Sequence, residues 1–383
     1  MTIASRFSGA AALLLFLLLA PAAIPARAQP VTPPPIAAKA FIVVDTLSGR
    51  TLAAANENDR FEPASFTKVM TAYLVFDAMR AGKLDANARV AVTETVMRAA
   101  GARMFVAPGK PVTVMQLLRG MIVQSANDAA LALAEAVAGS EAAFVERMNQ
   151  QARRMGLANT TFMNATGRPA PGHHASARDL ATLAGHLMRD FPERYSLYAE
   201  REFTYEGITQ ASHNRLLWTD PTVDGVKTGF TEAAGYCLLA SAKRGERRLI
   251  SVVLGARTDA LRTSETQKLL NFAFQAYDTR RVYGKGQVVA TPPIYKGTRS
   301  TVPLGFDRDI WLTLPRDRFD GLSAVLETQQ PFVAPLAAGQ KAGIMKLMRE
   351  QSTLAEIPVV ALEEVPVAGF LSRGWDTLRL LFK

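Results

Sequence analysis

The chain has 383 residues, which exceeds the size of an ordinary single core and predicts two domains. With 49% hydrophobic and 20% charged residues and no low-complexity tract, the composition is that of a globular protein and excludes a wholly disordered one. The formal net charge of +10 favours anionic surroundings such as nucleic acid, a phospholipid surface or an acidic polymer, without choosing among them.

The first 28 residues have the features of a secretory signal peptide. Arg6 supplies a short positive region, residues 10–20 form an unbroken apolar run, and Ala26-Arg27-Ala28 has the small-x-small pattern of a cleavage site. The apolar run is too short to span a bilayer comfortably, although an uncleaved N-terminal anchor is the alternative. We therefore expect cleavage after Ala28 and an exported protein that is soluble or peripheral.

The next part of the chain, residues 29–278, predicts one α/β (α+β) domain. After a Pro-rich leader, apolar runs at residues 41–44 and 51–53 flank a turn-rich connection and predict two strands. Apolar residues at helical spacing predict helices at residues 65–82, 114–123, 127–137, 177–188 and about 264–277. Late strands are expected at residues 225–229, 236–242 and 248–255, the last two as a hairpin. This order predicts that the first and last strands meet in one antiparallel sheet.

The pattern changes after residue 278. Residues 279–364 contain short apolar runs, such as 288–290, 310–314 and 324–326, and predict a small all-β domain. Residues 365–383 predict an amphipathic helix, because the apolar residues from Val367 to Phe382, except Leu380, fall in one sector of about 140°. A basic amphipathic helix with Trp and Phe suits a bilayer interface, and a helix docked on its own domain is the alternative.

Cys237 is the only cysteine, which excludes an intramolecular disulfide. It lies in an apolar strand-like run without a charged neighbour in sequence. A packed core thiol is therefore expected there rather than a nucleophile.

Three short motifs carry the chemistry: an SxxK, an SxN and a KTG pattern. They are Ser65-Phe66-Thr67-Lys68, Ser125-Ala126-Asn127 and Lys227-Thr228-Gly229. A helix cap with an exposed lysine, or a plain turn, would explain any one of them alone. Their order and spacing together resemble the motif set of penicillin-binding proteins and class A β-lactamases. The export signal is an independent observation in the same direction.

Ser65 and Lys68 are three residues apart at an expected helix start, so their side chains share one face. A serine hydroxyl is a poor nucleophile until a base takes its proton. A lysine can be that base if burial and a neighbouring cation, here Lys227, destabilise its ammonium. Acyl transfer also needs fixed donors for the oxyanion, which the N–H groups of Ser65 and of a residue beside the KTG strand could supply.

The other motif residues fit supporting roles. The hydroxyl of Ser125 could relay a proton to the leaving group, and the amide of Asn127 could hold Lys68 or the substrate, although Ser125 could also be an ordinary helix cap. Lys227 could bind a substrate carboxylate, and Thr228 adds a hydroxyl. Gly229 would let the substrate backbone approach the strand.

Over nearly its whole length the chain resembles the low-molecular-mass D-alanyl-D-alanine carboxypeptidases, penicillin-binding proteins of the S11 serine peptidase type. The matching stretches are residues 63–71, 124–129, 177–180, 214–218, 223–229 and 251–256. The resemblance implies a transpeptidase-like domain of the penicillin-binding and β-lactamase type. It also implies that Ser65 attacks the bond between two D-alanines of a peptidoglycan stem peptide, that water hydrolyses the acyl-enzyme, and that β-lactams acylate the same serine.

By the same resemblance, Lys68 accepts the proton and Lys227 binds substrate. The oxyanion hole would use the N–H groups of Ser65 and Phe230, while Arg215 and Arg262 would lie near the substrate carboxylate. The resemblance further implies a β-rich C-terminal domain and an amphipathic anchor at residues 367–383, hence a periplasmic protein peripheral to the inner membrane. No metal or cofactor is implied.

Two departures from the family pattern matter. Ala126 replaces the Asp of an SDN motif, which argues against a class A β-lactamase. Phe230 is bulky and apolar where the family often carries Thr or His, so we expect it to affect substrate preference or deacylation.

Several alternatives stay open from sequence. A serine β-lactamase would use the same nucleophile, a D,D-endopeptidase would cleave cross-links, and a wall-binding scaffold would be catalytically silent. A metal peptidase is disfavoured because His173 and His174 are adjacent and no HExxH exists, so we expect two solvated loop histidines. Nucleic-acid binding is not expected, given the export signal and the lack of an aromatic-basic motif.

Overall fold

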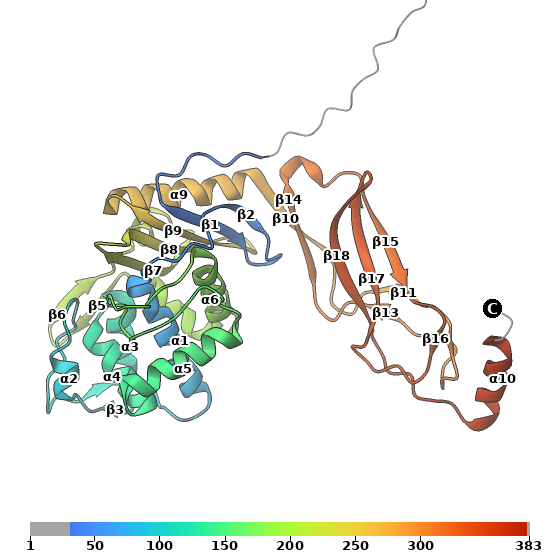
Figure 1. Cartoon of the computed structure of the whole chain (residues 1–383), viewed down its shortest axis with the longest axis horizontal. Coiled ribbons are helices and arrows are strands. Elements are labelled where there is room, and N and C mark those ends of the chain that lie inside the picture. Colours follow the sequence, from blue (N-terminus) through green and yellow to red (C-terminus); the bar gives the residue numbers. More distant parts are fainter. Residues whose placement is uncertain (1–30, 381–383) are drawn as a thin grey trace, which may run out of the picture. The chain divides into compact units, whose positions relative to one another are not determined.

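The computed structural model describes residues 31–380 (Figure 1). The predicted signal peptide and the last three residues of the predicted amphipathic helix lie outside this range. Within it, no helix combines the length and the apolar character that crossing a membrane requires.

One five-stranded antiparallel sheet organises the first part of the chain, in the order β2-β1-β9-β8-β7. The strands are β1 (Ala40–Asp45), β2 (Thr51–Ala55), β7 (Val223–Thr231), β8 (Gly235–Arg244) and β9 (Arg247–Ala256). β1 pairs with β9 over its whole length, with Ile42 opposite Val252. The prediction that early and late strands share one sheet is therefore confirmed, and so is the hairpin between β8 and β9.

Helices cover this sheet on both sides (Figure 1). α9 (Asp259–Ala276) covers one face, and most of the helices that precede it in the chain gather on the other. Those described there are α1 (Thr67–Arg80), α2 (Glu94–Met97), α3 (Val114–Val123), α4 (Asn127–Ala138), α5 (Glu141–Arg154), α6 (Ala177–Asp190) and α7 (Pro192–Tyr195). The short α8 (Leu216–Thr219) instead lies beside α9, and the two helices line a common pocket. The main core lies between the sheet and the helices α1 to α7, where residues such as Val69, Leu117 and Leu133 are fully buried.

The predicted helices are present; the one at residues 114–123 has the predicted ends, and the others are shifted at one or both ends. The first begins as a 3₁₀ turn, η1 (Ala64–Phe66), before α1. α9 begins five residues earlier than expected, because the Thr258 side chain caps it by accepting from the Leu261 N–H. The sequence pattern missed this first turn because the buried faces of α9 include the charged residues Arg262 and Glu265. α5 and a hairpin of β5 (Glu202–Tyr205) and β6 (Ile208–Ala211) were not predicted.

The all-β prediction for the C-terminal part is confirmed, and this part has its own core around Leu304, Phe306 and Val359. A five-stranded sheet runs in the order β11-β13-β18-β17-β15. Its strands are β11 (Val288–Ala290), β13 (Leu304–Gly305), β15 (Leu322–Thr328), β17 (Lys341–Arg349) and β18 (Ser352–Ala361). Smaller pairs are formed by β10 (Tyr277–Tyr283) with β14 (Ile310–Pro315) and by β12 (Ile294–Tyr295) with β16 (Phe332–Val333). A helix, α10 (Phe370–Leu380), follows.

Candidate active site

Ser65 lies in η1, immediately before α1, and its Oγ is 3.2 Å from Lys68 Nζ. The N-cap residue of α1 is Phe66, without a side-chain cap bond, so Ser65 is not an ordinary helix cap. Lys68 is not the exposed lysine of a surface helix either, because only 1% of it is exposed. Its Nζ donates to the Thr166 carbonyl oxygen as well as facing Ser65.

The electrostatics of this pair favour a neutral lysine. Burial lowers the pKa of Lys68 well below its ordinary value, and the positive charge of Lys227 lowers it further. Lys227 is itself buried, and burial together with the Arg262 charge lowers its pKa to about 7. A neutral lysine beside a serine hydroxyl can take the hydroxyl proton, which is the requirement for nucleophilic attack.

Two glycines from distant segments hold the backbone around Ser65. Gly167 lies so close that a Cβ built on it would be 1.7 Å from the Ala64 carbonyl oxygen. Gly229, in the KTG strand β7, also lies against η1, where a Cβ would be 3.2 Å from that of Ala64. Ala64 has a positive φ of 46°, an unfavourable conformation for a residue with a side chain. The position of Ser65 is therefore fixed by packing from both neighbours.

The SxN motif forms the turn between α3 and α4. Ser125 has a φ of 66°, and its buried Oγ has no hydrogen-bond partner among the residues that the structure describes. The N-cap of α4 is Ala126, so Ser125 is not the cap of that helix. The Asn127 amide donates to the Ala100 carbonyl oxygen at 2.6 Å. An unpaired buried hydroxyl is costly, which is consistent with a partner that arrives with the substrate.

A cavity of about 720 Å³ brings most of the predicted site residues together. Those that line it are Ser65, Ser125, Asn127, Arg215, Thr228, Gly229, Phe230 and Arg262. Lys68 and Lys227 are not in the lining and lie buried beneath it. Lys227 therefore acts on Lys68 through its charge. The Phe230 ring is half exposed and packs on Tyr236 with 4.6 Å between ring centroids.

The two predicted arginines share one carboxylate that the sequence reasoning did not select. Asp259 Oδ2 is 2.7 Å from Arg215 Nε, and Asp259 Oδ1 pairs with Arg262. Arg262 is buried and also donates to the Gly229 carbonyl oxygen at 3.3 Å, whereas the Arg215 side chain is 66% exposed.

Residues 166–169 form a wall of the cavity that the sequence pattern did not predict. Asn164 Oδ1 accepts from the N–H groups of Thr166, Gly167 and Arg168, and so shapes the loop that presents the Thr166 carbonyl to Lys68. The only signal in the sequence is a turn-like Asn-Ala-Thr-Gly run, because a backbone carbonyl can be contributed by any residue.

The prediction of two solvated histidines is wrong for His173. Its ring is buried, with Nε2 3.0 Å from Thr67 Oγ1 and Nδ1 3.3 Å from Asn164 Nδ2. Burial lowers the pKa of His173 to about 4, so it is a neutral structural residue that ties the Asn164 loop to α1. The prediction for Cys237 is confirmed, because the thiol is buried and burial raises its pKa to about 11.

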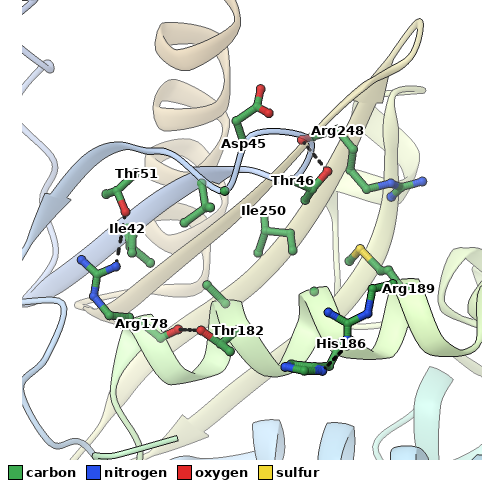
Figure 2. Close-up of a pocket in the computed structure, with 15 residues that line it drawn as sticks. Ile42, Asp45, Thr46, Thr51, Arg178, Thr182, His186, Arg189, Arg248 and Ile250 are labelled. Carbon is green, nitrogen blue, oxygen red and sulfur yellow. Dashed lines mark hydrogen bonds between the residues drawn. The ribbon is translucent and has the colours of Figure 1, made fainter. Parts of the chain in front are cut away.

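A second cavity, of about 500 Å³, lies where α6 meets β1, β2 and β9 (Figure 2). None of the predicted site residues lines it. Its three arginines, Arg178, Arg189 and Arg248, are each ion-paired with a different acid, respectively Glu57, Asp190 and Asp224. Of these two cavities, only the one that contains Ser65 brings motif residues together.

Comparisons with known proteins agree with this geometry. A family model described as D-alanyl-D-alanine carboxypeptidase matches residues 27–258, and one described as penicillin-binding protein 5, C-terminal domain, matches residues 277–367. The chain is 40% identical to D-alanyl-D-alanine carboxypeptidase DacC of Escherichia coli (strain K12), over 98% of this chain and 95% of that one.

Solved structures are similar as well. Penicillin-binding protein 5 from Haemophilus influenzae matches with a TM-score of 0.85 and 37% identity, covering 88% of this chain and all of that one. Penicillin-binding protein D2 from Listeria monocytogenes, in its ampicillin-bound form, matches with a TM-score of 0.59 and 33% identity, over 64% of this chain and all of that one.

Gly167→Ala should destabilise the protein more than Gly172→Ala. Both glycines have φ above 80°, so an alanine at either position would be strained by the left-handed backbone conformation to a similar degree. Only at position 167 does the added Cβ strike backbone, whereas at 172 the nearest atom is 3.9 Å away. We expect an additional loss of about 1–3 kcal/mol in urea unfolding for Gly167→Ala. Equal losses in the two variants would contradict the role of this contact.

Lys227→Met should raise stability near neutral pH. The folded-state pKa of Lys227, about 7, lies below the ordinary value of 10.5, so between these values the unfolded chain binds more protons and stability rises with pH. Methionine does not bear the free-energy cost of burying a charged lysine, and this cost disappears as the lysine loses its proton. The advantage of the variant in melting temperature should therefore shrink as pH rises from 7 towards 10.5. Lys243→Met, an exposed lysine on β8, is the control and should change little at any pH. An advantage independent of pH would contradict this assignment.

Proposed function

The chain belongs to the S11 family of D-alanyl-D-alanine carboxypeptidases, and from this premise we propose that Ser65 is its nucleophile and Lys68 its base. The protein is a serine-type D-Ala-D-Ala carboxypeptidase and a penicillin-binding protein with a role in the cell wall. The observation that carries the assignment of Ser65 and Lys68 is their 3.2 Å contact, in which the lysine is buried and its pKa is lowered.

In the proposed acylation, neutral Lys68 Nζ takes the Ser65 proton while Oγ attacks the carbonyl carbon between the two D-alanines. The N–H groups of Ser65 and Phe230 stabilise the oxyanion, as fixed donors do in acyl transfer. The proton then passes through the Ser125 hydroxyl to the departing nitrogen. The C–N bond breaks, D-alanine leaves, and the peptide remains as an ester on Ser65. The unpaired, buried Ser125 Oγ supports this relay.

In the proposed deacylation, water attacks the ester carbonyl and gives a proton to Lys68. The ester bond breaks, and Ser65 Oγ regains a proton as the shortened peptide leaves. Lys227 supports both steps by keeping the pKa of Lys68 low through its charge. Asn127, Thr228 and Gly229 are proposed to hold the substrate backbone.

Arg215 and Arg262 are proposed to receive the terminal carboxylate of the substrate. Both line the cavity that contains Ser65, and a guanidinium binds a carboxylate with two parallel hydrogen bonds. Lys227, buried beneath the cavity, adds positive charge on the same side.

A division into a catalytic domain at residues 29–278 and a small β-rich domain at residues 279–364 is also proposed. It is supported by the two separate cores and by the two family models, which match different parts of the chain.

Ser65→Ala should abolish release of D-alanine from muropeptides that end in D-Ala-D-Ala, because the variant lacks the hydroxyl that forms the proposed acyl-enzyme. Mass analysis of a defined muropeptide mixture measures the loss of one D-alanine, and Ser264→Ala on α9 is the matched control. Cleavage of cross-linked dimers by the unchanged enzyme would add a D,D-endopeptidase activity. Release that survives Ser65→Ala would exclude Ser65 as the nucleophile.

We further propose that the protein is exported to the periplasm and held at the inner membrane by residues 367–383. Phe370 and Trp375 of α10 are 88% and 61% exposed, with Arg373 and Arg379 exposed on the same short helix. α10 is also tied to its own domain, because Asp376 accepts from the Lys296 N–H at 2.6 Å. A tethered helix with exposed aromatics and a basic flank supports contact with a bilayer interface.

Deletion of residues 367–383 should move the protein from the membrane fraction to the soluble fraction of the periplasm. Loss of the exposed aromatic and basic residues removes both the apolar and the electrostatic contribution to binding. Fractionation measures this, and the mass of the exported full-length protein should correspond to a chain that starts at Gln29. Unchanged membrane association of the shortened protein would argue that α10 is only a docked helix.

A further inference from the structure

Asp259 is the one acidic residue among the described residues that line the cavity around Ser65. Its two carboxylate oxygens contact different arginines, Arg215 at 2.7 Å and Arg262. Both arginines are those proposed to bind the terminal carboxylate of the substrate. A carboxylate of the protein thus occupies the place in which a carboxylate of the substrate is expected.

The two arginines differ in their freedom to change partners. Arg262 is 6% exposed, and it also donates to the Gly229 and Cys237 carbonyl oxygens, so its position is fixed. Arg215 follows the β5–β6 hairpin at the start of α8, and its side chain is 66% exposed. Only Arg215 can therefore exchange Asp259 for another carboxylate without loss of buried contacts.

The net charge of Asp259 and its two arginines favours the binding of one further carboxylate at Arg215. The arginines of the second cavity each have an acid of their own, whereas Arg215 and Arg262 share one. Two guanidinium groups and one carboxylate leave a single positive charge, which matches a single incoming carboxylate. Without Asp259, this wall would present two uncompensated guanidinium groups, with the Lys227 ammonium buried beneath the cavity.

We propose that Asp259 is an internal counterion that competes with the terminal carboxylate of the substrate, and that the substrate displaces it from Arg215 on binding. The inference rests on the proposed function of the two arginines. Asp259 then determines specificity by weakening the binding of all anions to the arginine pair. Only a ligand that makes further contacts in the cavity compensates for the displaced ion pair, which selects peptides over small free carboxylates.

The sign of the effect separates this proposal from a simple scaffolding role. If Asp259 only holds Arg215 and Arg262 in place, its removal misplaces both arginines and raises KM. If it competes with the substrate, its removal frees Arg215 and lowers KM, while kcat changes little because Ser65 and Lys68 are untouched.

The test uses the full-length enzyme and a pentapeptide that ends in D-Ala-D-Ala. Asp259→Asn keeps the size of the side chain and removes its charge, and we expect KM to fall about tenfold, equivalent to about 1.4 kcal/mol, with kcat nearly unchanged. Asp259→Glu restores the charge and should return KM towards the wild-type value. Asp77→Asn is the matched control, because Asp77 forms an exposed ion pair with Arg80 at 2.7 Å on α1.

Two further measurements isolate the carboxylate. The same pentapeptide with a C-terminal amide, used as a competitor, should bind Asp259→Asn no better than wild type. Arg215→Gln should raise KM only slightly in the wild-type background and strongly in the Asp259→Asn background, where Arg215 is free to bind substrate. An increased KM for Asp259→Asn, or an equal gain for the amide competitor, overturns the proposal.

The outcomes also separate this inference from the proposed function. If the unchanged enzyme releases no D-alanine, the proposed function fails. If the unchanged enzyme is active and Asp259→Asn does not lower KM, only the counterion role fails. Labelling of Ser65 by a fluorescent penicillin and the melting temperature establish that each variant is folded. If Asp259→Asn is not folded, Asp259→Ala is measured in its place.

Discussion

Burial of the Lys68 side chain against Ser65 is the constraint on which the rest of the site depends. An amine buried without a counter-charge favours its neutral form, and the nearest strong charge, Lys227, has the same sign. The Thr166 carbonyl holds the amine without neutralising it. A carboxylate in its place would favour the charged form and remove the base. The absence of an acid from the described contacts of Lys68 is therefore as important as the contacts themselves.

Much of the fold was predictable because its strands and helices are indicated by local patterns of apolar residues in the sequence. Alternating and helical periodicities located most strands and helices of the sheet domain, and the motifs located Ser65, Ser125 and Lys227 on them. The ends of elements were less predictable. The first turn of α9 depends on a cap at Thr258 and on the buried Arg262, whose burial requires the carbonyl groups of β7 and β8 to be nearby.

The missed parts of the site share one physical reason: they act through tertiary contacts or through the backbone. Thr166 contributes a carbonyl, for which no residue type is required. His173 contacts Thr67, which is 106 positions away, so its burial leaves no local trace. Asp259 lies before the expected start of α9 at about residue 264 and belongs to no motif. Only its contacts with the neighbouring Arg262 and the distant Arg215 indicate a role.

The packing of Gly167 and Gly229 around Ala64 has a consequence for when the enzyme can act. Three segments of the chain must meet before Ser65 takes its position, and the last of them, β7, also brings the Lys227 charge. In a partly folded chain Lys68 is hydrated, keeps the ordinary pKa of a lysine, and leaves the serine hydroxyl inert. Reactivity is thus a property of the completed fold, and a nascent or unfolded polypeptide carries no active nucleophile to damage itself or its neighbours.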